Sequence, residues 1–335
     1  KNNILLCALA MSPLILSGCQ VVSVKNQKVN VTIANERDSI LTRSKMSEAS
    51  LNVLSMTGRE AKSCTDEPEK CVADLAEIPQ IQDEQLLSTA SEIYLTKAIN
   101  LGDSSNCKVS LFSKHQSTEK QQASQKNYEQ CLDQQMVMLD NSIRYSYAYL
   151  FKTERQPQDR IFNNRQVQIR DFYNQALAKL ISTYAIRNKK QKVAKQIKVG
   201  KSTYRINFNG YPALAQIELE DLVSSYNLNF SGLRSINRRD GFGAEFVAIL
   251  PNTTAPEENK YIVNPFDYKY KNGINPNIHQ PRYLSVSIAA QPENANESLQ
   301  NILHNPNFQL NVYDPYSIEN LKIGGKQYPL AANFS

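Results

Sequence analysis

The sequence predicts an α+β protein, with an antiparallel helical domain followed by a β-rich domain. No glycine lies between Asp103 and Val199, whereas the chain from Gly200 onward holds 8 of the 11 glycines and 10 of the 14 prolines. Because glycine and proline interrupt regular structure and mark turns, we expect long helices before this point and short strands after it. The apolar residues also change here from a period of 3.6 to simple alternation.

The composition is that of a globular protein. The 335 residues are 41% hydrophobic and 21% charged, with a formal net charge of +6 and a mean hydropathy of −0.48. This length can form one large or two moderate domains, and the composition excludes a disordered chain and a polytopic membrane protein. The positive charge is spread thinly, so we expect no nucleic-acid partner.

The helical domain is expected to span residues 45–197. Its apolar periodicity predicts four helices, at residues 45–56, 86–101, 128–150 and 169–184. Asp83 is the expected N-cap of the second helix, and Gly102 should lie just past its end. Pro157 marks the expected break before the last helix. The tyrosines and methionines on these helices are interpreted as core residues, since they follow the apolar stripes.

The β-rich domain is expected to span residues 198–335. Short alternating runs predict strands at 204–208, 214–219, 246–250, 284–289 and 308–313. Residues 264–281 are expected to form an ordered surface loop. Gly241-Phe242-Gly243 lacks the third glycine and the following helix of a dinucleotide-binding loop, so it predicts a tight turn before the strand from Phe246.

The first 19 residues resemble a bacterial lipoprotein signal peptide. A basic residue precedes an apolar run from Ile4 to Leu16, and the run ends in Leu16-Ser17-Gly18-Cys19. This run is shorter than the roughly 20 residues that span a bilayer. The resemblance implies removal of residues 1–18, acylation of Cys19 and a lipidated tether over residues 19–44. A short buried helix with an incidental Cys19 is the alternative.

Acylation at Cys19 would anchor a globular protein to a membrane surface without inserting it. Gln20 follows the cysteine where, in the lipoprotein family, Asp favours retention in the inner membrane. We therefore expect a location in the bacterial cell envelope, at the periplasmic face of the outer membrane. The sequence begins with Lys1 instead of Met, so we also expect the chain to be a fragment of a longer protein.

An even set of cysteines remains once Cys7 and Cys19 are assigned to the signal and the lipid: Cys64, Cys71, Cys107 and Cys131. In an oxidising compartment such a set predicts disulfides, and four cysteines allow three pairings. We favour Cys64 with Cys71, across the turn-forming insert 65–69. We also favour Cys107 with Cys131, joining the loop after one helix to the next helix.

No catalytic, cofactor-binding or metal-binding residue is predicted. A metal site at the cysteines is the weaker interpretation, because no C-x-x-C pair occurs and the only histidines are His115, His279 and His304. No G-x-S-x-G is present, and neither His279 nor His304 has an acid partner recognisable by spacing. Lys201-Ser202 resembles the end of a phosphate-binding loop, but Lys195 occupies the position of its first glycine.

The sequence contains two basic segments. Eight basic residues and no acidic one occur between Arg187 and Arg205. On a lipid-tethered protein they could lie against anionic head groups, but we favour a solvated helix end and linker. Arg238-Arg239-Asp240 predicts a further basic turn with no assigned chemistry.

Four stretches of the β-rich domain resemble the upstream portion of a family of large bacterial lipoproteins that are α/β hydrolases: Ser231-Gly232-Leu233-Arg234, Arg238–Ala244, Leu310–Tyr316 and Ile323–Phe334. In that family a lipoprotein signal and a helical region precede these elements, and the catalytic domain follows them. The resemblance implies that the serine elbow and triad lie beyond Ser335. None of those catalytic residues can be assigned to this chain.

The sequence therefore predicts one of two functions. The chain is either the non-catalytic N-terminal region of a membrane-anchored esterase- or lipase-like hydrolase, or a complete non-enzymatic envelope lipoprotein that acts as a protein-interaction module. The membrane, through Cys19, is the expected partner in both cases. The hydrolase domain of the same protein is the further partner in the first case, and another envelope protein is the further partner in the second.

Overall fold

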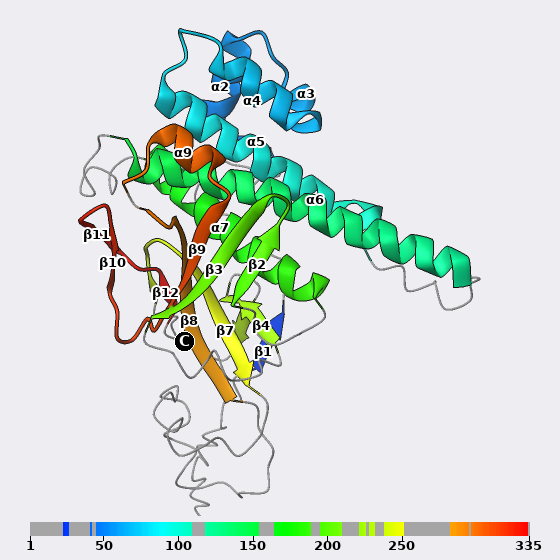
Figure 1. The fold of residues 1–335 in the computed structure, drawn as a ribbon, viewed down its shortest axis with the longest axis vertical. Coiled ribbons are helices and arrows are strands. Elements are labelled where there is room, and N and C mark those ends of the chain that lie inside the picture. The colour runs from blue at the N-terminus through cyan, green and yellow to red at the C-terminus, as the bar shows by residue number, and fades with distance from the viewer. Residues whose placement is uncertain are drawn as a thin grey trace, which may run out of the picture.

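The structure is a computed structural model, and it describes residues 23–26, 41, 45–108, 118–153, 164–188, 195–209, 221–225, 228–231, 238–250, 282–294 and 296–333. Helices occupy the N-terminal part and strands the C-terminal part, as predicted (Figure 1). The transition falls between the end of the last long helix at Arg187 and the first strand of the main sheet at Gln196.

The N-terminal part consists of α2 (Glu48–Met56), α3 (Ala61–Asp66), α4 (Pro68–Ala76), α5 (Asp83–Asp103), the 3₁₀ turn η2 (Ser105–Cys107), α6 (Thr118–Phe151) and α7 (Asn164–Arg187). These include the four predicted helices. Two predictions about α5 are wrong in detail. Asp83 is its first residue, with Gln82 preceding it and bonded to the Gln85 side chain, and Gly102 lies inside the last turn.

The main sheet has six strands in the order β2-β3-β9-β8-β7-β4. Its strands are β2 (Gln196–Val199), β3 (Ser202–Asn209), β4 (Asp221–Ser224), β7 (Ala244–Leu250), β8 (Arg282–Pro292) and β9 (Asn307–Tyr313). All neighbours are antiparallel except β3 and β9, which are parallel. Four of the five predicted strands lie within β3, β7, β8 and β9. The expected strand 214–219 and the expected loop 264–281 lie outside the described residues.

Smaller strand pairs complete the β-rich part. β10 (Asn320–Ile323) and β11 (Lys326–Pro329) form a hairpin, and β12 (Ala332–Asn333) pairs with β6 (Arg238–Arg239). β1 (Ser23–Asn26), which lies inside the segment expected to be a tether, pairs with β5 (Leu228–Ser231). A short helix, α9 (Leu299–His304), begins at the N-cap Ser298 and was not predicted.

One hydrophobic core joins the helices to the sheet. α5 packs on α6, α6 packs on α7, and both α6 and α7 contact strands of the main sheet. At the centre, the ring of Phe308 on β9 lies 6.1 Å from that of Tyr147 on α6 and 5.8 Å from that of Tyr204 on β3. All three side chains are fully buried. The packing is therefore continuous across the change from helices to strands, which falls between Arg187 and Gln196.

Candidate functional site

The predicted lipidation site, Cys19, lies outside the described residues, as do His115 and His279. His304 is exposed at the C-terminal end of α9. Within the part of the chain that the structure describes, no helix is long and apolar enough to cross a bilayer. The same residues contain no cluster of three or more His, Cys, Asp or Glu side chains that could hold a metal ion.

The four remaining cysteines lie in the two favoured pairs. Cys64 and Cys71 have a Cα–Cα distance of 5.1 Å, and Cys107 and Cys131 have one of 5.3 Å, both within the range of a disulfide. The second pair joins η2, directly after α5, to α6, as the sequence indicated. It thereby links the C-terminal end of α5 covalently to α6, on which α5 packs.

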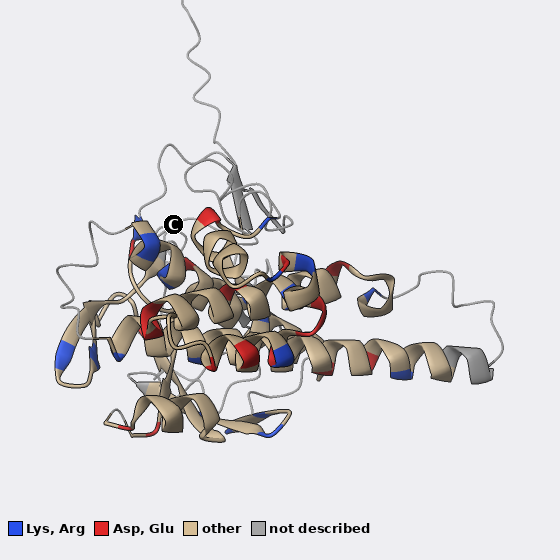
Figure 2. Ribbon diagram, turned by 90° about the horizontal axis from the view of Figure 1, so that it is seen from above, with Lys and Arg blue, Asp and Glu red and all other residues tan. Residues whose placement is uncertain are grey.

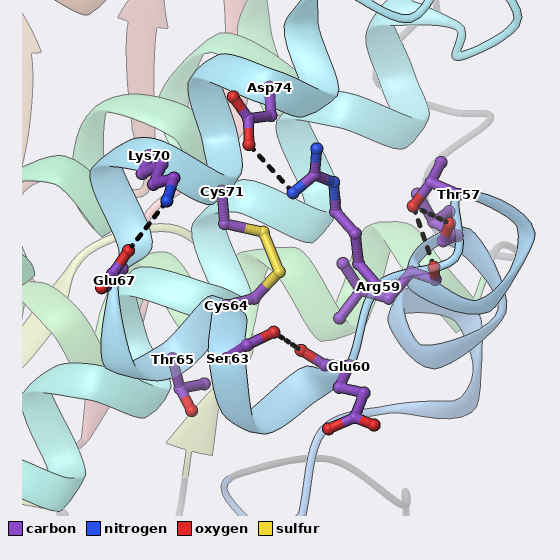
Figure 3. Close-up of a disulfide and its surroundings, with 12 residues drawn as sticks. Thr57, Arg59, Glu60, Ser63, Cys64, Thr65, Glu67, Lys70, Cys71 and Asp74 are labelled. Atoms are coloured by element: carbon purple, nitrogen blue, oxygen red, sulfur yellow. Dashed lines mark hydrogen bonds and ion pairs between the residues drawn. A yellow bond between two sulfur atoms is a disulfide. The ribbon is translucent and has the colours of Figure 1, made fainter.

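The first disulfide lies in a different local structure from the expected turn (Figure 3). Residues 65–69 form the junction of two helices, α3 and α4, and Pro68 occupies the first position of α4, where its missing N–H costs nothing. Cys64 and Cys71 are both buried at this junction. Arg59 pairs with Asp74 at 2.9 Å beside them, so an ion pair and a covalent bond hold the same corner.

The basic segment after α7 is partly neutralised. Arg187 pairs with Asp133 at 3.1 Å and with Glu129 at 3.4 Å on α6, and Arg205 pairs with Glu293 at 2.6 Å. Figure 2 shows both basic and acidic residues along the helices. These contacts favour the interpretation of a solvated helix end, while Lys189, Lys190 and Lys192 lie outside the described residues.

Arg239 contacts parts of the β-rich domain that lie far apart in the sequence. Its Nε donates to the carbonyl of Leu330 at 2.9 Å, and its Nη2 donates to the carbonyls of Pro315 at 3.1 Å and Ile318 at 2.9 Å. The expectation of a basic turn at Arg238-Arg239-Asp240 is therefore wrong. Both arginines lie in strand β6, and Arg239 is a fixed donor to three backbone oxygens. We call this assembly the Arg239 junction.

The backbone around Gly241 completes the Arg239 junction. Phe242 donates to the carbonyl of Pro329 at 2.9 Å and accepts from the amide of Ala331 at 3.0 Å. A Cβ atom on Gly241 would lie 2.4 Å from the oxygen of Pro329, so only glycine fits there. The side chain of Asn174 on α7 donates to Gly241 O at 2.9 Å and accepts from Gly243 N at 2.8 Å. Asn174 thus links α7 to residues 241–243, where Phe242 forms a β-bridge with Leu330 in place of the expected tight turn.

A second polar cluster lies between α6 and the sheet. Arg144 and Asp140 form a buried ion pair at 2.9 Å, and Ser202 on β3 donates to Asp140 at 2.6 Å. Tyr204 also donates to Asp140. Burial and then the nearby carboxylate raise the pKa of the Tyr204 hydroxyl well above its usual value, so it stays a proton donor. The cluster fastens the helical layer to the sheet.

A third cluster fastens α2 to the long helices. Glu92 on α5 is fully buried and accepts from the backbone N–H of Ser47 at 2.7 Å and from the hydroxyl of Ser50 at 2.6 Å. Arg165 on α7 donates to the side-chain hydroxyls of Ser47 and Ser50, each at 2.8 Å. Burial lowers the pKa of the Arg165 guanidinium, and the Glu92 carboxylate opposes this shift.

These three clusters hold structural elements in position. In the two carboxylate clusters a serine donates directly to the acid, and among the residues that the structure describes no histidine lies between the serine and the acid. The Arg239 junction presents its charge to carbonyl oxygens of its own chain. Each arrangement holds elements in place. Comparisons with protein-family models, with curated proteins and with solved structures found no match to this chain.

Proposed function

We propose that this chain is the N-terminal, non-catalytic region of a membrane-anchored α/β hydrolase of the bacterial envelope, with an ester or lipid-like substrate. The observation that supports it is the Arg239 junction. Three of the four stretches on which the hydrolase resemblance rests meet there: Arg238–Ala244, the end of Leu310–Tyr316, and Ile323–Phe334. Residues far apart in the sequence thus form one unit, as expected for a framework upstream of a catalytic domain.

In this proposal the helical layer supports the Arg239 junction, and the junction supports the domain that follows. Asn174 links α7 to the junction, and the Asp140 cluster links α6 to β3. The protein would be attached through acylated Cys19 to the periplasmic face of the outer membrane. The two cysteine pairs at disulfide distance support an oxidising compartment.

The activity assay compares the longer gene product with purified residues 20–335. We expect the longer protein to hydrolyse p-nitrophenyl esters and to react with a fluorophosphonate probe, because a downstream serine would supply the nucleophile. Residues 20–335 should do neither. Ester hydrolysis by residues 20–335 would overturn the proposal. A gene that stops after Ser335 would instead favour the non-enzymatic interaction module.

The lipid anchor is tested separately by Cys19→Ser in the full-length gene. We expect the variant to leave the membrane fraction and to lose incorporation of labelled palmitate, because the acyl chains supply the membrane affinity. Cys7→Ser, which changes a residue of the expected signal peptide, is the matched control and should retain both. Unchanged labelling of the Cys19→Ser protein would refute the anchor.

A further inference from the structure

The segment directly after the proposed lipidation site forms a strand. Ser23–Asn26 is β1, and it pairs antiparallel with β5, with Ser23 opposite Ser231 and Asn26 opposite Leu228. Only four residue steps separate Cys19 from Ser23. A fully extended chain covers about 3.3–3.6 Å per residue, so Cys19 lies within about 14 Å of the start of β1.

The distance from Cys19 to Ser23 is much shorter than the distance that a flexible tether would allow between the lipid and the folded part. If residues 19–44 were a flexible coil, the folded part would begin at Lys45, 26 steps from Cys19, with a root-mean-square distance of about 25–30 Å and a far longer maximum. Pairing of β1 with β5 removes this freedom. It limits the reach of the anchor to about 14 Å from Ser23, which lies opposite Ser231 at the end of β5.

We infer that β1 and β5 hold the lipid anchor so that this end of the molecule rests on the membrane surface. The inference rests on the acylation of Cys19 proposed above. Figure 1 shows α2, α3 and α4 at one end of the long axis, and β1 toward the other end, beyond the long helices. The membrane therefore lies next to the β1–β5 pair, and the disulfide-bonded corner formed by α3 and α4 points away from it.

The absence of tryptophan from the sequence allows a direct test. Phe230→Trp places a single fluorophore in β5, opposite Val24, and Met56→Trp places one at the end of α2, where the native side chain is 70% exposed. The acylated proteins, expressed from residues 1–335 with an initiator methionine so that no other tryptophan is present, are reconstituted into phosphatidylethanolamine–phosphatidylglycerol vesicles that contain a lipid with a nitroxide on its head group. We expect several-fold stronger quenching of the Phe230→Trp protein than of the Met56→Trp protein.

A linker variant separates proximity from simple attachment. A Gly-Ser insertion of about 16 residues between Gln20 and Ser23 lengthens the connection by a root-mean-square distance of about 22 Å. The Phe230→Trp protein with this insertion should still float with vesicles but should lose most of its quenching. Insertion of the same linker after Asn26 leaves the connection before β1 unchanged and should preserve the quenching.

Flotation distinguishes the two possible failures. Proteins that float while the Phe230→Trp and Met56→Trp forms are quenched equally, or not at all, would overturn the orientation and leave the anchor intact. Proteins that do not float would overturn the acylation and the orientation together. Circular dichroism of each variant verifies that it is folded before the quenching is compared.

Discussion

Arg144 on α6 donates through Nη2 to the hydroxyl of Ser202 on β3 at 3.0 Å, and both side chains are buried. The same guanidinium lies 4.3 Å from the ring centroid of Phe308 on β9 and donates to the carbonyl of Ile302 on α9 at 3.1 Å, so both the sheet and α9 contact this buried cation. Because Asp140 balances this charge, the contact between the layers depends on a complete network.

Arg144→Met should therefore be strongly destabilising. It leaves the carboxylate of Asp140 buried without its cation, and removal of one partner from a buried pair costs about 3–5 kcal/mol in the free energy of unfolding. Arg187→Met is the control, since the Arg187 side chain is 30% exposed in its pair with Asp133 and should contribute about 0–1 kcal/mol. Urea titrations of both variants measure the difference, and equal losses would contradict a structural role for the Asp140 cluster.

Gly241→Ala should disrupt the Arg239 junction. The added Cβ would meet backbone atoms of Pro329 and Ala331 that strand pairing holds in place, so we expect a loss of about 3 kcal/mol or more. Gly58→Ala is the matched control. Its φ of +67° gives strain of about 1–2 kcal/mol, but no atom lies within 4 Å of the new methyl group. The expected order would be refuted if thermal unfolding showed the two variants to be equally stable.

The two disulfides should contribute unequally. Their sequence separations are 24 for Cys107–Cys131 and 7 for Cys64–Cys71. Because a longer closed loop loses more entropy in the unfolded chain, we expect about 3.5 kcal/mol for the first and about 2.5 kcal/mol for the second. Paired alanine substitutions, compared with the oxidised wild type by denaturant unfolding, test this order. Non-reducing peptide mapping should show both links, and four free thiols would contradict them.

The stability should also carry a pH dependence from Glu245. Burial raises the pKa of this carboxyl, although Arg238 and the hydroxyl of Ser225 oppose the shift. The folded state therefore holds the proton more tightly than the unfolded state. Stability from this group is full below its ordinary pKa of 4.5 and falls as the pH rises through the higher folded value.

Glu245→Gln removes this titration. Between pH 4 and pH 7, the free energy of unfolding of the wild type should fall relative to that of the variant, which stays neutral throughout. Paired urea titrations across this range measure the difference between the two proteins. A wild type that gains stability over the variant with rising pH would show that the Arg238 ion pair outweighs burial.

The sequence by itself determined the order and type of the main elements. The glycine-free stretch from Asp103 to Val199 and its apolar period predict α6 and α7, and alternation predicts β3, β7, β8 and β9. These signals are local, because a helix or strand shows its buried face at a fixed spacing along the chain. The pairings Cys64–Cys71 and Cys107–Cys131 could also be expected, since each joins neighbouring elements.

The partners of the buried polar residues became known from the three-dimensional structure. Arg238-Arg239-Asp240 carries no local sign of its partners, because the carbonyls that Arg239 binds belong to residues 76 to 91 positions away. Glu92 and Asp140 lie on helices whose stripes predict only apolar contacts, yet both are buried against serines of distant segments. A buried polar group takes whichever donor or acceptor the packed chain brings to it, and the spacing of residues along one segment does not contain that information.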